Sequence, residues 1–184
     1  MTKPEYIIVA NKKYKINTDY RVALECEKIA QNYEIDDFER ALAIIYKLFG
    51  DEAIDDKAHW NDFFEKAKKY FKCGKEEKNI DKEPNINFEQ DESLINASFM
   101  SDYKIDLETT HMHLWTFFDL LNGLTENCVL NRIRFVRDFD LSTIKDSKER
   151  QKWKEQKELW AIKRKKTIEE IELDKYWDEQ LKKR

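Results

Sequence analysis

Glycine and proline, the residues that most often interrupt helices, are nearly absent from this chain. Its 184 residues include three glycines and two prolines, whereas glutamate, lysine, leucine and alanine are common. Because these four residue types favour helix and the interrupting types are scarce, helix is expected along nearly the whole chain. The sequence therefore predicts a mainly α fold, a small helical domain with few sharp turns.

The balance of charged and aromatic residues indicates a folded chain rather than a disordered polyelectrolyte. Charged residues make up 39% of the sequence and aromatic residues 13%, and a chain with so many aromatic side chains can bury a core. The length suits one domain, or one domain with an appendage, and a small core drawn from about 100 residues. The net charge of −4 argues against a general nucleic-acid-binding protein.

The N-terminal part predicts a β-hairpin followed by three helices. Two short β-prone runs, Tyr6–Val9 and Tyr14–Ile16, flank a turn. A first helix begins after the capping group Asn17–Asp19. A second follows Asp36 and Asp37, and Gly50 suits its C-terminal end. A third spans about Asp55–Phe71, where large apolar residues recur every three or four positions.

The polar segment Cys73–Gln90, with Gly74 and Pro84, is predicted to be a solvated linker. Three further helices follow, one from Asp91, one over Thr109–Leu121 and one over about Glu126–Arg137. The helical periodicity of these segments and of those before the linker predicts a core that includes Phe38, Leu42, Phe63, Leu94, Phe99, Trp115, Phe118, Leu121 and Ile133.

The last 40 residues differ in character from the rest. Residues 145–184 contain no glycine or proline and carry 14 Lys or Arg against 10 Asp or Glu, a net +4 that leaves −8 for residues 1–144. We therefore divide the chain into a helical body, 1–144, and a long, charged, weakly amphipathic C-terminal helix, 145–184. Two roles are predicted equally for this helix, docking on the body and binding a partner. A frayed helix is a less favoured prediction. Its candidate partner-binding residues are Trp153, Trp160, Ile168, Ile171, Trp177 and Leu181.

Two histidines, His111 and His113, suggest a metal site, but their spacing does not favour one. Residues two apart on a helix point about 200° away from each other, so the two rings could not share a metal. A Glu-x-x-His match starting at Glu108 occurs once, whereas a di-iron bundle needs two copies and two further glutamates. We expect no metal here, and expect the ring nitrogens to cap or bond the backbone.

Two other clusters have a structural and a functional interpretation. The apolar run around Trp115, Phe117 and Phe118 could form a binding groove, but so dense a run on one helix favours the core. The basic cluster Lys163–Lys166 could contact phosphate, but nearby glutamates favour a solvated helix face.

Catalytic signatures are absent from the sequence. It has no phosphate-binding loop, no dinucleotide fingerprint, no nucleophile elbow and no HExxH motif. Its three cysteines, Cys26, Cys73 and Cys128, are far apart and suit a reducing cytosol. Neither a membrane-spanning apolar run nor a signal peptide is apparent. We expect no enzyme activity, no cofactor and no membrane association.

The order of several motifs resembles a known family. After an Asn-Thr-Asp-Tyr-Arg stretch, two short aromatic helices and a polar linker, the order continues with Asp91–Ile95, Tyr103–Leu107, Met112–Leu124 and an Ile133-x-x-x-Arg137 segment. A Lys/Glu/Gln-rich C-terminal helix completes the pattern. In this order the chain resembles the "gp fifteen" family of tailed phages and prophages of Gram-positive bacteria, over roughly residues 5–165 and most closely over 91–140. Leu114 stands where a second aromatic residue is common in the family.

The resemblance implies a late morphogenesis protein, encoded among tail genes just upstream of the tape-measure protein. Such a protein looks like one half of a tail assembly chaperone pair, which covers the helical, aggregation-prone tape measure and recruits tail-tube subunits. The implied partners are the phage tape-measure protein, the companion tail assembly chaperone or the tail-tube protein. The implied location is the cytoplasm of the bacterial host. A homo-oligomer is a further alternative. The family offers no catalytic residues to transfer, and the His113–Trp115 motif serves only as a family marker.

Two other functions compete with the chaperone. The first is a structural component of the mature tail or of the head–tail connection, which would be found in purified virions. The second is a nucleic-acid-binding phage regulator that uses the basic C-terminal helix, with an affinity that falls steeply with salt. The overall negative charge already counts against the second.

Overall fold

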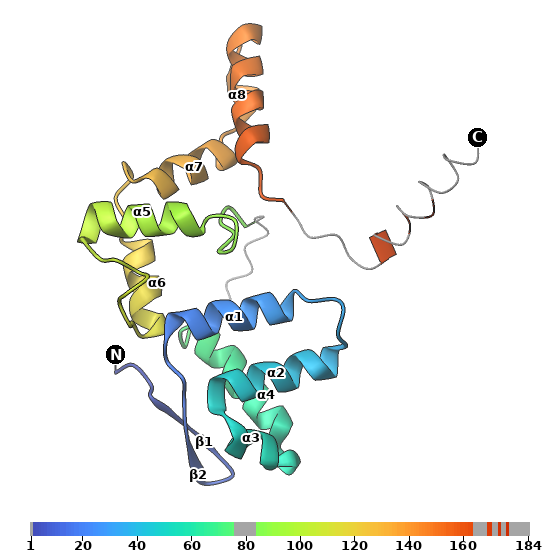
Figure 1. Ribbon diagram of the computed structural model, residues 1–184. Helices are drawn as coiled ribbons and strands as arrows, with labels where there is room; N and C mark the ends of the chain where they lie inside the picture. Colours follow the sequence, from blue (N-terminus) through green and yellow to red (C-terminus); the bar gives the residue numbers. More distant parts are fainter. Residues whose placement is uncertain (1, 76–83, 164–168, 171–172, 174–175, 177–184) are drawn as a thin grey trace. The chain divides into compact units, whose positions relative to one another are not determined.

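The computed structural model describes residues 2–75, 84–163, 169, 170, 173 and 176 of the chain (Figure 1). It is mainly helical, with one antiparallel two-stranded hairpin at the N-terminus, which confirms the predicted fold class. The chain forms two compact units, the first made of residues 1–77 and 164–184 and the second of residues 78–163. The boundary predicted at residue 144 falls inside the second unit.

The hairpin pairs β1 (Tyr6–Val9) with β2 (Lys12–Lys15), and Val9 faces Lys12 at its closed end. The two turn residues, Ala10 and Asn11, have φ angles of 45° and 63°. Positive φ at both positions is the geometry that matches the right-handed twist of the strands in a two-residue turn. The second strand begins two residues earlier than predicted, because this turn is short.

Two well-capped helices follow the hairpin. In α1 (Tyr20–Ala30), the Asp19 carboxylate accepts a hydrogen bond from the Arg21 amide at 2.9 Å. In α2 (Asp37–Phe49), Asp36 and Glu39 form a reciprocal capping box. Both starting points agree with the predicted ones, because these caps involve only neighbouring residues.

The helix predicted over Asp55–Phe71 is interrupted near its start. The structure has α3 (Asp51–Asp55), η1 (Lys57–His59) and α4 (Trp60–Phe71), with a break at Asp56. The Asp56 carboxylate accepts a hydrogen bond from the Tyr14 hydroxyl at 2.7 Å and lies 2.7 Å from His59 Nδ1. Hydrogen bonds from His59 and then from Tyr14 lower the pKa of Asp56.

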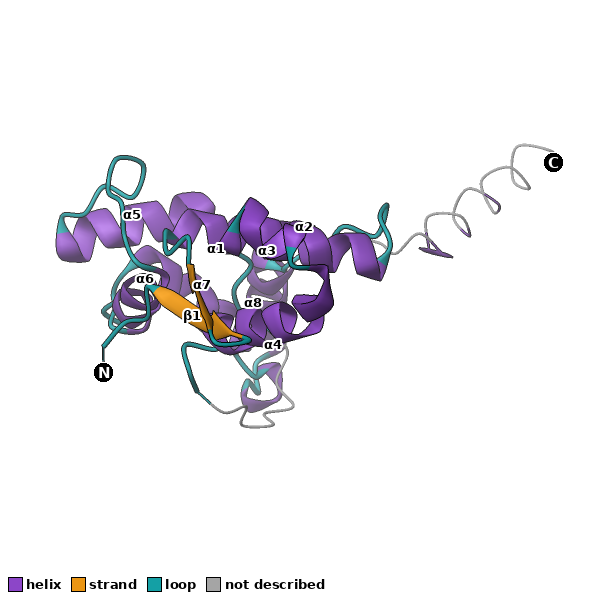
Figure 2. Cartoon of the chain, turned by 90° about the horizontal axis from the view of Figure 1, so that it is seen from below, coloured by secondary structure: helices purple, strands orange, loops and turns teal. Residues whose placement is uncertain are grey.

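The core of the first unit lies between the hairpin, α2 and α4, which contact one another through buried aromatic rings. Figure 2 shows the hairpin strands in orange and the helices in purple. Phe63 is fully buried, and its ring meets Tyr14 edge-on at 4.7 Å between centroids. The core prediction is wrong for Phe38, which lies in the first turn of α2 and is 58% exposed, although its ring packs in a tilted arrangement on Trp60 at 5.5 Å between centroids. Leu42 is half-buried.

The second unit contains α5 (Glu92–Tyr103), α6 (Leu114–Asn122), α7 (Val129–Asp138), η2 (Leu141–Thr143) and α8 (Ser147–Trp160). Among the described residues, α7 packs against both α5 and α8. The helix predicted over Thr109–Leu121 begins five residues later, at Leu114.

The core of the second unit is built around Phe99 and Phe117. Both are fully buried, and their rings stack at 5.4 Å between centroids. The predicted core residues Phe99, Leu121 and Ile133 are buried, whereas Leu94, Trp115 and Phe118 are half-buried. Phe88, from the predicted linker, packs against Phe117 and Phe118, so this end of the linker joins the core rather than lying in solvent.

The C-terminal helix begins close to the predicted position but ends at Trp160. Asp146 caps α8 through the Glu149 amide, and Ala161 has the extended angles φ −57° and ψ 140°. Residues 161–163 are not helical, so the helix predicted over 145–184 is not continuous. Residues 164–168 and most of those that follow lie outside the described part of the chain.

Candidate partner-binding surface

The structure describes two of the six predicted partner-binding residues. Trp153 and Trp160 are seven residues apart in α8 and therefore share one helix face. Ile168, Ile171, Trp177 and Leu181 lie outside the described residues. The described part of the surface therefore consists of α8 and the elements that α8 contacts.

The Trp153 ring contributes to an aromatic cluster with two rings of α7 and its C-terminal end. It stacks on Phe139 at 4.2 Å between centroids, with an interplanar angle of 11°. Phe135 meets both of these rings edge-on, Phe139 at 5.6 Å and Trp153 at 6.3 Å. Phe135 nevertheless stays 59% exposed, and Phe139 and Trp153 are half-buried. We call Phe135, Phe139 and Trp153 the aromatic cluster.

Phe135 and Phe139 were not predicted as part of the surface. Their spacing of four is a signal that the sequence contains, although Phe139 is the residue that follows α7. The prediction for this helix named Val129, Leu130, Ile133 and Val136, of which Leu130 and Ile133 are buried.

Other contacts between α8 and its surroundings are largely polar. The Lys157 ammonium donates to the Phe139 carbonyl at 2.7 Å, and the Arg150 guanidinium donates to the Ile144 carbonyl at 2.6 and 3.1 Å. No residue of α8 is buried, and Leu159 is 67% exposed. The helix is thus attached by the ring contacts of Trp153 with Phe139 and Phe135, and by cations that bind backbone carbonyls.

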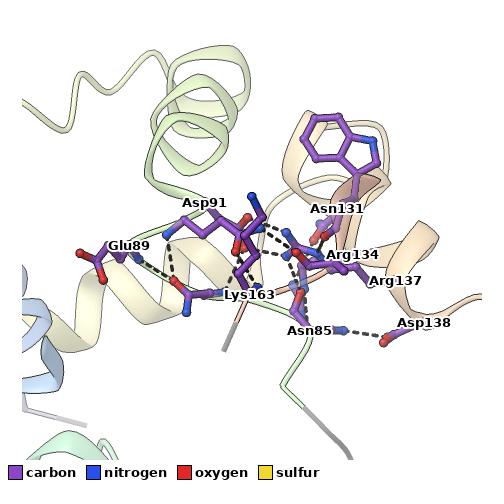
Figure 3. A network of polar contacts seen from close by, with 12 residues as sticks. Asn85, Glu89, Asp91, Asn131, Arg134, Arg137, Asp138 and Lys163 are labelled. Atoms are coloured by element: carbon purple, nitrogen blue, oxygen red, sulfur yellow. Dashed lines mark hydrogen bonds and ion pairs between the residues drawn. The ribbon is translucent and has the colours of Figure 1, made fainter. Parts of the chain in front are cut away.

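A buried ion pair lies where α8 ends (Figure 3). The Arg137 guanidinium donates to both Asp91 oxygens, at 2.6 and 2.7 Å, and the two side chains are 6% and 1% exposed. This two-point geometry is the strongest form of an arginine–carboxylate contact. The Asn87 amide adds a further hydrogen bond to Asp91 at 2.9 Å.

Arg137 also binds the backbone of two segments far away in sequence. Its Nε donates to the Trp160 carbonyl at 2.6 Å, and one terminal nitrogen donates to the Asn85 carbonyl at 3.0 Å. The Trp160 carbonyl belongs to the last turn of α8, which has no helical partner for such groups. Arg137 therefore ties together the start of α5, the end of α7 and the end of α8.

Side chains next to this ion pair hold the same segments. Asn85 accepts from Arg134 Nε at 3.1 Å and donates to Asp138 at 2.7 Å. The Gln90 amide donates to the Ala161 carbonyl at 3.0 Å and accepts from the Lys163 amide at 2.9 Å. Because Gln90 binds both a carbonyl and an N–H, it fits an extended backbone. We call Ala161–Lys163 the strap.

The histidine pair has a different setting from the predicted one. His111 and His113 both precede α6, so the prediction that they lie on a helix is wrong. His113 is the N-cap of α6, and its Nδ1 accepts from the Trp115 amide at 3.0 Å. This backbone bond confirms the structural role expected for one of the two rings.

Among the described residues, no cluster of three or more His, Cys, Asp or Glu could hold a metal ion. Burial raises the pKa of the Cys26 thiol to about 12, so this thiol stays protonated at neutral pH. Every helix within the described ranges is too short or too polar to cross a bilayer.

Comparison with known proteins completes the assignment. Neither the curated proteins nor the solved structures contain a significant match to the chain. The family described as Bacteriophage Gp15 protein matches residues 4–162, which include the hairpin, α1 to α8 and the first part of the strap. Since this match spans most of the chain, the protein belongs to the Bacteriophage Gp15 protein family and is a phage structural or morphogenesis protein.

Proposed function

We propose that this chain is a tail assembly chaperone that binds the phage tape-measure protein in the cytoplasm of the bacterial host. A tail-tube subunit and the companion chaperone are further partners in the proposal. Family membership leads as far as a structural or morphogenesis protein. The aromatic cluster on α7 and α8 is the observation that carries the binding role. The proposal assigns the chain no catalytic step and no cofactor.

The aromatic cluster has the properties expected of a reversible contact with a helix. Aromatic rings supply large contact areas with little loss of conformational entropy, and Phe135 offers a ring that is 59% exposed. A tape-measure helix with an apolar stripe could cover such a ring. The lysines and glutamates of α8 keep the free protein hydrated and make the contact sensitive to salt.

Co-expression with the tape-measure protein tests this role. The unaltered chain should keep the tape measure in the soluble fraction, and Phe135→Ala should lose most of that effect. Phe38→Ala is a matched control, because Phe38 is a phenylalanine of the first unit with almost the same exposure, 58%. Equal solubility with all three chains would contradict a binding role for the aromatic cluster.

Shortened chains separate α8 from the residues that follow it. A chain that ends at Lys163 keeps the second unit and lacks the predicted anchors Ile168, Ile171, Trp177 and Leu181. A chain that ends at Asp146 lacks α8 as well. If only the shorter chain fails to hold the tape measure in solution, α8 is the binding element. If both fail, the later anchors are required.

The composition of purified virions distinguishes the chaperone from a structural component. A chaperone should be absent from finished particles. If the chain is present in virions and the unaltered protein does not keep the tape measure soluble, it is a component of the mature tail or of the head–tail connection.

A further inference from the structure

We infer that α7 presents a docking surface for an amphipathic helix, and that α8 occupies this surface within the chain. A partner helix must then compete with α8 for Phe135 and Phe139. The fitting partner is a helix with an aromatic anchor and a lysine four residues later, as Trp153 and Lys157 are placed in α8. The inference rests on the proposed function for the partner's identity, and adds how access to the surface is controlled.

The weak attachment of α8 is the first observation behind this inference. The other helices of ten or more residues and α6 each bury at least two side chains, whereas α8 buries none. Its ring contacts all come from Trp153, which stacks on Phe139 and meets Phe135 edge-on. The Phe135 ring is left mostly uncovered while α8 is docked, so the surface on α7 is larger than α8 covers.

The kind of occupant follows from what already lies on the surface. A helix is docked there, its aromatic ring lies flat on Phe139, and its Lys157 binds the Phe139 carbonyl at 2.7 Å. These two contacts require a flat ring and a cation four residues further along a helix. Another helix with this pair of side chains can make the same contacts.

The strap holds α8 in place through contacts that depend on the backbone. Gln90 binds the Ala161 carbonyl and the Lys163 amide, and Arg137 binds the Trp160 carbonyl. Gln90 is exposed, so its two hydrogen bonds can break without burying a polar group. Release of the strap would free the end of α8 while leaving the buried Asp91–Arg137 pair intact.

The contribution of Gln90 can be expressed through the fraction of molecules in which α8 is released from α7, which we call the open fraction. A net hydrogen bond typically changes an equilibrium by a factor of about 5, so loss of both Gln90 bonds should raise the open fraction about 5- to 30-fold. While the closed form predominates, the apparent affinity of a competing helix rises by the same factor as the open fraction.

A peptide from the chain itself provides the probe. A labelled peptide of residues 147–160, blocked at both ends, carries Trp153 and Lys157 but lacks the strap. Fluorescence anisotropy should show weak binding to the full-length chain and about 5- to 30-fold tighter binding to the full-length Gln90→Ala variant. Gln90→Glu should give an intermediate gain, since it keeps the acceptor for the Lys163 amide. Amide hydrogen exchange at Lys163 should accelerate by a similar factor in Gln90→Ala.

Two controls make the result specific. Gln151→Ala removes an amide that bonds only to Glu155 within α8, and should leave peptide affinity unchanged. A peptide with Trp153→Ala should not bind. The inference is overturned if Gln90→Ala speeds exchange at Lys163 without tightening peptide binding, if exchange at Lys163 is unaltered, or if the Trp153→Ala peptide binds equally well. None of these readouts involves the tape measure, so failure here is distinct from failure of the proposed function.

Discussion

Replacing Arg137 with methionine should destabilise the second unit by about 3–5 kcal/mol, because it leaves the Asp91 carboxylate buried without its cation. The two side chains are 6% and 1% exposed, so solvent screens the pair very little. The same change removes the donors to the Trp160 and Asn85 carbonyls. Those lost hydrogen bonds account for about 1 kcal/mol each within the total.

A double variant separates the cost of the orphaned charge from the cost of lost packing. Asp91→Leu combined with Arg137→Met removes both charges and keeps apolar volume at both positions. Its expected loss is about 1–2 kcal/mol, since no buried charge is left alone. The double variant should therefore be about 2–3 kcal/mol more stable than Arg137→Met alone.

Urea unfolding followed by tryptophan fluorescence measures these losses. Trp60 lies in the first unit and Trp177 lies outside the described residues. Both should be changed to phenylalanine, so that the three remaining tryptophans report on the second unit. A loss below about 1 kcal/mol for Arg137→Met, or an equal loss in the single and double variants, would show that the ion pair does not hold this region together.

Four further changes test other parts of the structure. Ala10→Asn with Asn11→Gly places preferred residues at the two positive φ angles of the hairpin turn. The free energy of unfolding of the first unit should rise by up to about 1 kcal/mol, which a higher urea midpoint would show. The pKa of Asp56 is lowered in the fold, so its stabilising contribution is present above the unfolded value of about 4 and is lost as pH falls through the folded pKa. The urea midpoint should therefore drop more steeply below about pH 4 in the unaltered chain than in Asp56→Asn; parallel curves would exclude this role. Phe117→Ala should cost about 3–5 kcal/mol in denaturant unfolding, because the ring is fully buried, and a loss under about 1 kcal/mol would remove it from the core. His113→Ala should cost about 1 kcal/mol of thermal or urea stability, whereas His113→Asn should keep most of the cap; equal losses would exclude capping as its role.

Part of the surface on α7 and α8 could be predicted from the sequence, and part could not. Trp153 stood out because a large aromatic residue in a strongly charged helix has few neighbours to explain it. Its stacking partner Phe139 could not be identified in the same way. Phe139 follows α7 by one residue, and α8 reaches it only after the chain has turned back through η2. The exposure of Phe38 shows the opposite error, since helical spacing predicts a face but not what covers that face.

The helical character of the chain, the hairpin and several helix starts could be predicted from the linear pattern of residues. These features depend on residues within about one helical turn of each other, as with the Asp19 and Asp36 caps, so a linear pattern records them. The resemblance to the phage family was also present in the linear order of motifs, and the family match over residues 4–162 confirms it.

The end of α8 and the contacts that hold it depend on tertiary packing and could not be predicted from the linear pattern. Arg137 meets Asp91 across 46 residues of sequence, and Gln90 meets Lys163 across 73. Acidic, basic and amide side chains are too numerous in this chain for such pairs to be selected by spacing. Their partners depend on how α5, α7 and α8 pack, because a buried charge is stable only where the fold brings its counter-charge and hydrogen-bond partners to it.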